Sequence, residues 1–153
     1  MTSYVKTMRE KIGHDMLILA GAGVLPYKDG RVLLQKRRDN GCWAINGGCM
    51  EVGETAEATA KRELFEETGL VAKTLELVGV FSGEDMLYTY PNGDKVCVVA
   101  IQYACRDFGG ELSPQVEEVA ELRWFEINNL PENINPPDIR PINAIVEYVS
   151  KHY

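Results

Sequence analysis

Four glutamates recur at fixed intervals in the segment Gly48–Leu70, which reads GCMEVGETAEATAKRELFEETGL. They are Glu54, Glu63, Glu66 and Glu67. The last three stand at i, i+3 and i+4, and at about 100° per residue they share one face of a helix. Three like charges side by side destabilise a helix, and a divalent cation that prefers oxygen ligands, such as Mg²⁺, Ca²⁺ or Mn²⁺, would reverse that effect. The spacing therefore predicts a metal-binding face.

The residues around this face predict a helix that begins after Thr55 and ends at Gly69. Thr55 can accept a backbone N–H bond at the helix start, and Gly69 suits the left-handed residue that closes a helix. Leu64 and Phe65 lie on either side of the acidic face, and we expect both to be buried. The glutamates would then lie in a cleft and not on open surface.

The whole pattern is more specific than an acidic helix. Gly48, five residues, Glu54, seven residues and then the run RELFEETGL at Arg62–Leu70 resemble the signature of the Nudix hydrolase family of MutT-like proteins, with every specified position filled. A solvated acidic helix face is the alternative interpretation, and it does not account for the other matched positions. The resemblance implies an α/β fold, the Nudix α/β/α sandwich with a mixed central sheet, in one domain over residues 1–153.

The resemblance also implies a reaction, the metal-dependent hydrolysis of the pyrophosphate bond of a nucleoside diphosphate linked to another moiety. Mg²⁺ or Mn²⁺ would neutralise the phosphate oxygens and activate water. The residues that would hold the metal are Glu63, Glu66, Glu67 and, through its backbone carbonyl, Gly47. Arg62 would orient the acidic cluster. The candidates for the catalytic base are Glu54, Glu63 and a later carboxylate.

Charged residues outside the signature are further candidates. Glu117 and Glu118 begin a predicted strand, in a region where relatives of the Nudix family often place another functional carboxylate; surface charge is the alternative. Arg37 and Arg38 end a predicted strand just before the glycine-rich loop, where they would contact a bound phosphate unless they are a solvated strand end. Family members commonly carry Pro where this chain has Asn46, so we expect different loop geometry near the substrate.

The rest of the chain alternates apolar segments with turn signals. Turns are expected at Lys28-Asp29-Gly30, Pro91-Asn92-Gly93-Asp94 and Gly109-Gly110. Strands are expected at Asp15–Leu25, Arg31–Arg38, Ala72–Phe81, Met86–Tyr90, Lys95–Cys105 and Glu117–Phe125. Helices are expected at Ser3–Ile12 and Ile139–Tyr148. Tyr88 and Tyr90 are interpreted as half-buried strand residues, with stacking on a base as the alternative.

Composition excludes several classes of protein. The net charge of −7 argues against binding to nucleic acid, and it requires metal ions or local basic residues for an anionic substrate. No apolar run reaches about 18 residues, and the polar N-terminus is unlike a signal peptide, so we expect a cytoplasmic protein without a membrane span. The four cysteines lack zinc-ligand spacing. The predicted N-terminal helix either packs on the domain or makes a dimer contact, so the sequence leaves a homodimer as one alternative.

The substrate is not determined by these residues. A modified nucleoside triphosphate is favoured slightly over an ADP-sugar, because the chain is short and shows no additional dimerisation domain. A Nudix module that binds a nucleotide without hydrolysing it is a third alternative, and the intact signature argues against it.

Overall fold

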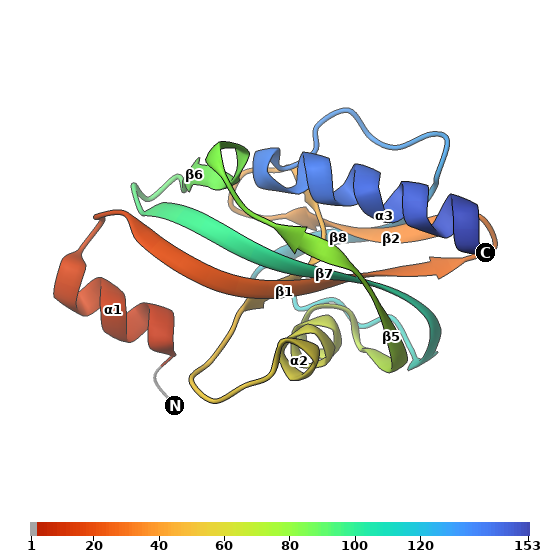
Figure 1. The fold of residues 1–153 in the computed structure, drawn as a ribbon, viewed down its shortest axis with the longest axis horizontal. Coiled ribbons are helices and arrows are strands. Elements are labelled where there is room, and N and C mark those ends of the chain that lie inside the picture. The colour runs from red at the N-terminus through yellow and green to blue at the C-terminus, as the bar shows by residue number, and fades with distance from the viewer. Residues whose placement is uncertain (1–2) are drawn as a thin grey trace.

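The computed structural model describes residues 3–153 and shows a mixed β-sheet with helices on both faces (Figure 1). The helices are α1 (Tyr4–Ile12), α2 (Ala56–Thr68) and α3 (Ile139–His152), with short 3-10 turns η1 (Glu84–Met86) and η2 (Pro136–Asp138). The strands are β1 (Leu17–Lys28), β2 (Arg31–Arg37), β3 (Trp43–Ala44), β4 (Asn46–Cys49), β5 (Leu70–Phe81), β6 (Leu87–Thr89), β7 (Lys95–Gly110) and β8 (Val119–Glu126). The predicted fold is confirmed. None of the helices in this described part of the chain is long and apolar enough to cross a membrane.

The sheet is organised around β1. Its main path runs β3-β2-β1-β7-β5, and β4, β6 and β8 pair with β1, β7 and β2. Strands β1 and β7 are parallel along their length, and the other pairs are antiparallel. Gly47 of β4 lies opposite Gly23 of β1, and a Cβ on Gly47 would lie 2.5 Å from the carbonyl oxygen of Ala22. Only glycine at position 47 therefore allows β4 to lie this close to the central strand β1.

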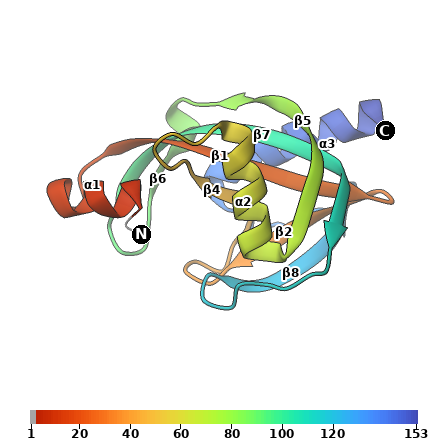
Figure 2. The same ribbon diagram turned by 90° about the horizontal axis from the view of Figure 1, so that it is seen from below.

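The two main helices cover opposite faces of the sheet (Figures 1 and 2). On the α2 face, Ala60 and Leu64 are fully buried with Ala22 and Leu33. The prediction for Phe65 is wrong, because this side chain is 57% exposed. Phe65 follows Leu64 by about 100° around the helix, and that rotation takes it away from the sheet that Leu64 contacts.

The predicted start and end of α2 are confirmed, whereas β1 and β7 extend beyond their predicted ends at Leu25 and Cys105, to Lys28 and Gly110. Thr55 accepts a bond from the backbone N–H of Ala58, and Gly69 closes α2 with φ of 82°. The turn predicted at Gly109-Gly110 is wrong, because both residues lie in β7 and pair with Val71 and Leu70. A Cβ on Gly110 would lie 2.6 Å from the carbonyl oxygen of Gly69, so glycine serves close approach of two chain segments there.

Candidate active site

Arg62 joins three carboxylates on the exposed side of α2. Its Nε and Nη2 donate to the two carboxylate oxygens of Glu54 at 2.7 and 3.0 Å, a bidentate pair. Its Nη1 donates to Glu63 at 2.9 Å and lies 3.3 Å from Glu66. The pair of Arg62 with Glu66 is the longest of the three. Arg62 is thus fixed mainly by Glu54 and can orient Glu63.

Glu54 is held from several directions. Besides the Arg62 pair, it accepts hydrogen bonds from the Thr59 hydroxyl at 2.9 Å and from the backbone N–H of Glu51 at 3.0 Å. The Arg62 hydrogen bond is the main cause that lowers the pKa of Glu54 to about 2. Glu54 therefore stays ionised at neutral pH and is a weak proton acceptor.

Glu63 lies under the glycine-rich loop. Its side chain is 16% exposed, and a Cβ on Gly48 would lie 2.5 Å from its carboxyl carbon. Glycine at position 48 is what allows the loop to cover this carboxylate. Burial raises the pKa of Glu63, and the charge of Arg62 partly opposes that shift.

Glu67 is the most enclosed member of the acidic face. The residue is 5% exposed, and its Oε1 is buried with no hydrogen-bond partner within residues 3–153. Burial raises the pKa of Glu67 well above its ordinary value, and the Gln35 side chain and the Gly47 backbone N–H act against this shift. Glu66 differs, because its side chain is 49% exposed. The predicted common face therefore has two enclosed carboxylates and one at the rim.

These residues fit a hard divalent cation. The donor set consists of carboxylate oxygens, and the unpartnered Oε1 of Glu67 is a buried acceptor that a cation would satisfy. Within the described residues, no three His, Cys, Asp or Glu side chains are already gathered closely enough to hold a metal ion.

A cavity of about 250 Å³, here called the charged cavity, lies beside Glu67. It brings together both charged pairs that the sequence singled out, since it is lined by Gln35, Arg37, Arg38, Asp39, Glu67, Glu117 and Glu118. Glu118 lies near enough to Glu63 and Glu67 for its charge to contribute to their raised pKa values. Glu54, Arg62, Glu63 and Glu66 are not part of this lining, and Gly47 lines a different cavity.

Arg37 and Arg38 point to different partners. Arg37 donates to both carboxylate oxygens of Asp39, at 2.9 and 2.7 Å. Arg38 donates to the backbone carbonyl of Val119 at 3.2 Å. Arg37 also lies over the ring of Tyr90, 5.6 Å from its centroid, and it lines a second cavity as well as the first. Arg37 therefore lies at the boundary between the charged cavity and this second cavity.

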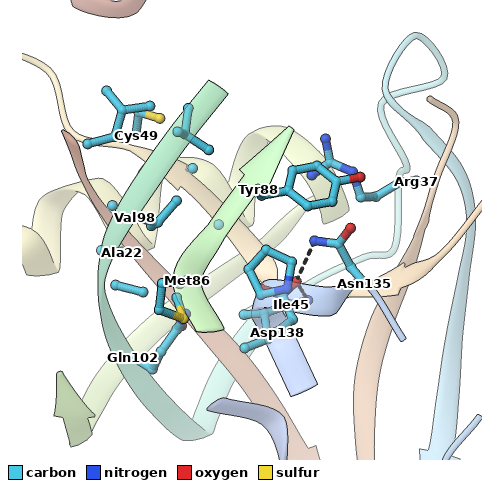
Figure 3. Close-up of a pocket in the computed structure, with 18 of the residues that line it drawn as sticks. Ala22, Arg37, Ile45, Cys49, Met86, Tyr88, Val98, Gln102, Asn135 and Asp138 are labelled. Carbon is cyan, nitrogen blue, oxygen red and sulfur yellow. Dashed lines mark hydrogen bonds between the residues drawn. The ribbon is translucent and has the colours of Figure 1, made fainter. Parts of the chain in front are cut away.

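The second cavity, here called the aromatic cavity, measures about 110 Å³ (Figure 3). Tyr88 and Tyr90 lie on one side with their rings edge to face and their centroids 5.0 Å apart. Both are half-buried, as expected. Asn135 and Asp138 lie near Tyr88 in Figure 3, and the Asn135 amide donates to the Asp138 carboxylate at 3.5 Å. The cavity thus combines aromatic surface with fixed polar groups.

Three polar residues of this cavity were not among the sequence-based candidates: Gln102, Asn135 and Asp138. Gln102 is 5% exposed, and its Oε1 has no hydrogen-bond partner within residues 3–153. Asp138 accepts from the backbone N–H of Ile45 at 3.2 Å, and burial raises its pKa to about 6. In the sequence, Gln102 is only a polar residue inside an apolar strand, and Asp138 is only an acidic residue before a helix. Neither pattern indicates a cavity.

A search with family models matches the NUDIX domain over residues 18–145. The chain belongs to the Nudix family. This match confirms the family predicted from the signature. The matched region contains nearly all of the sheet and helix α2. Helix α1 lies before it.

Two relatives and one solved structure illustrate the similarity of this chain to known proteins. An ADP-ribose pyrophosphatase of Methanocaldococcus jannaschii is 41% identical over 108 residues, which are 69% of this chain and 60% of that protein. A MutT-like protein of Streptomyces ambofaciens is 31% identical over 134 residues, which are 88% of this chain and 80% of that protein. The crystal structure of a MutT Nudix hydrolase from Burkholderia pseudomallei superposes with a TM-score of 0.72 at 28% identity, over 84% of this chain and 98% of that one.

Proposed function

We propose that this Nudix chain is a metal-dependent hydrolase that cleaves the pyrophosphate bond of a nucleoside diphosphate linked to another moiety. The observation that carries the proposal is the buried, unpartnered carboxylate oxygen of Glu67, next to a cavity that also contains Arg37 and Arg38. Acidic metal ligands opposite basic phosphate ligands suit a polyanionic substrate in a protein of net charge −7.

Glu63, Glu66, Glu67 and the Gly47 carbonyl would hold Mg²⁺ or Mn²⁺. A divalent cation bound there would neutralise the diphosphate oxygens and lower the pKa of the attacking water. The choice between the two metals rests on the chemistry of the ligands, since both accept carboxylate and carbonyl oxygens.

The chain's own residues position the reactants. Arg37 and Arg38 would orient the diphosphate from the opposite wall, with Arg37 exchanging part of its pairing with Asp39 for a phosphate oxygen. As water oxygen bonds to phosphorus, the bond from phosphorus to the bridging oxygen breaks and a proton leaves the water. We assign that proton to Glu63, because Arg62 holds both carboxylate oxygens of Glu54 and the lowered pKa of Glu54 makes it a weak acceptor.

The supporting residues have separate roles in this proposal. Arg62, fixed by Glu54, would orient Glu63. Glu118 would be the additional carboxylate, because its charge acts on both Glu63 and Glu67, whereas Glu117 lines the same cavity without such an effect. The nucleoside would occupy the aromatic cavity, where Tyr88 and Tyr90 offer ring surface and Arg37 connects it to the diphosphate.

One of the relatives is named for its substrate. The Methanocaldococcus protein is named for ADP-ribose, whereas the name of the Streptomyces protein gives only its likeness to MutT. ADP-ribose contains a nucleoside joined to another moiety through a diphosphate, and the proposal covers substrates of this kind. A homodimer, a cytoplasmic location and a single domain over residues 1–153 stay predictions from the sequence.

The test is a substrate panel with Mg²⁺ or Mn²⁺, containing nucleoside triphosphates, ADP-sugars and dinucleotides, with products identified by mass spectrometry. The expected products are a nucleoside monophosphate and the phosphorylated remainder, or pyrophosphate from a triphosphate. Glu67→Gln is expected to abolish turnover. Equal turnover by this variant would contradict the proposed metal site, and nucleotide binding without turnover by the wild type would favour a binding module.

A further inference from the structure

Helix α1 lies outside the region that the Nudix model matches, yet it is firmly attached to the domain. Figures 1 and 2 show it beside the start of β1 and close to the turn between β6 and β7. Its apolar residues Val5, Met8 and Ile12 pack on a cluster formed by β1 and β7. The Nη atoms of Arg9 donate to the carbonyls of Asp15 at 2.6 Å and Lys95 at 2.8 Å.

The helix encloses a third cavity, of about 350 Å³, here called the helix-side cavity. Helix α1 contributes Val5 and Arg9, and the β6–β7 turn contributes Asn92 and Asp94. The helix-side cavity and the aromatic cavity share four lining residues: Leu19, Cys49, Tyr90 and Val96. Asp39, the partner of Arg37, lines both the helix-side cavity and the charged cavity. The three cavities therefore meet around the Arg37–Asp39 pair.

The polar groups of the helix-side cavity favour a neutral ring. Its charged side chains are two carboxylates, Asp39 and Asp94, and one guanidinium, Arg9, so a phosphate group would meet net negative charge there. The Nε of Arg9 is buried without a hydrogen bond within the described residues, and it lies 3.6 Å from Asp94 Oδ2. A hydroxyl group can accept from such a donor and donate to such a carboxylate.

We propose that α1 and the β6–β7 turn form a second substrate subsite, which takes an uncharged, hydroxyl-bearing ring such as a sugar attached to the diphosphate. The inference rests on the proposed function, because it places the diphosphate in the charged cavity and the nucleoside in the aromatic cavity. Arg37 lines the aromatic cavity, which would take the nucleoside, and Asp39 lines the helix-side cavity, which would take the sugar. A substrate that carries both groups on one diphosphate can therefore bind across the Arg37–Asp39 pair. Substrates of the nucleoside diphosphate sugar type then fit better than triphosphates.

The test measures binding by calorimetry with Mg²⁺ and the α,β-methylene analogues of ADP-ribose and ADP, whose bridging carbon prevents hydrolysis. Wild type is expected to bind the ADP-ribose analogue about tenfold more tightly than the ADP analogue. Val5→Trp, which fills the helix-side cavity, is expected to remove that difference while leaving the affinity for the ADP analogue unchanged. Lys6→Trp is the matched control, because it places the same side chain on the exposed side of the same helix and should keep the preference.

Two results would overturn the subsite. One is a wild type that binds both ligands equally, and the other is a Val5→Trp variant that keeps the preference of the wild type. Neither result bears on pyrophosphate hydrolysis, which the substrate panel decides separately. A second variant, Asn92→Trp in the exposed β6–β7 turn, enters the same cavity from the other wall and should reproduce the loss even where Val5→Trp is poorly folded.

Discussion

The acidic face of α2 and the aromatic cavity differ in how the chain builds them. The acidic face comes from one helix, so its glutamates are neighbours in sequence, and Arg62 pairs with Glu63 and Glu66 but not with Glu67. The aromatic cavity collects Tyr88, Gln102 and Asp138 from segments far apart in the chain. Under the proposed function, the catalytic residues would lie on the local element and nucleoside recognition on the dispersed one, and the two regions meet at Gly47 and Gly48, which line the aromatic cavity.

The largest expected effect comes from Glu63→Gln on the helix side of this comparison. If Glu63 binds metal and accepts the proton, kcat should fall by about 10²- to 10⁴-fold, with KM changed much less. Steady-state kinetics against the best panel substrate measures both constants. Glu57→Gln is the control, because Glu57 is an exposed carboxylate of the same helix outside the acidic face. Similar losses in both variants would mean that helix charge, and not a specific carboxylate, matters.

Gly48→Ala should also affect the acidic face of α2, by displacing a carboxylate and not by removing one. A Cβ at this position would meet the carboxyl group of Glu63 at 2.5 to 2.7 Å, so the carboxylate must move. We expect kcat to fall about 10- to 100-fold, because small displacements of a reacting group are costly. Gly79→Ala, whose Cβ would meet only ordinary contacts from Phe81 at 3.5 Å or more, should retain activity. A fully active Gly48→Ala enzyme would contradict the position assigned to Glu63.

Tyr88→Ala tests the other side of the comparison. Loss of the ring surface should raise KM about tenfold for nucleotide substrates, in keeping with about 1–3 kcal/mol for a base stacked on an aromatic ring. The kcat value should stay within a few fold of wild type, since Tyr88 does not line the charged cavity. A fall in kcat with unchanged KM would show that recognition and chemistry are not separated in this way.

Asp138→Asn should produce the smallest effect, and it concerns stability. The folded-state pKa of about 6 lies above the ordinary 3.8, so the stability contribution of Asp138 is fully present below pH 3.8 and is lost as the pH rises through 6. Asn cannot ionise. The free energy of unfolding of the variant should therefore exceed that of wild type by about 1–3 kcal/mol at pH 8, with little difference at pH 4. Urea denaturation at the two pH values measures this, and a difference independent of pH would contradict the assigned ionisation.

The difference between the two regions also explains what could be predicted from the sequence. Helix α2, its capping residues and its glutamates follow from local spacing, and Arg37, Arg38 and Glu118 could be guessed from their places at strand ends. The exposure of Phe65 and the close approach at Gly110 depend on tertiary packing. Gln102 and Asp138 face a cavity only because β7 and η2 converge there, and no local pattern records that convergence.

The central claim is that the enclosed carboxylates of α2 hold a divalent cation. Titration of Mn²⁺ into the wild type and Glu67→Gln, followed by electron paramagnetic resonance of the free ion, measures this directly and requires no substrate. The account predicts saturable binding to wild type and an affinity at least about tenfold weaker in Glu67→Gln, with Glu57→Gln unchanged. Equal binding by wild type and Glu67→Gln would contradict it.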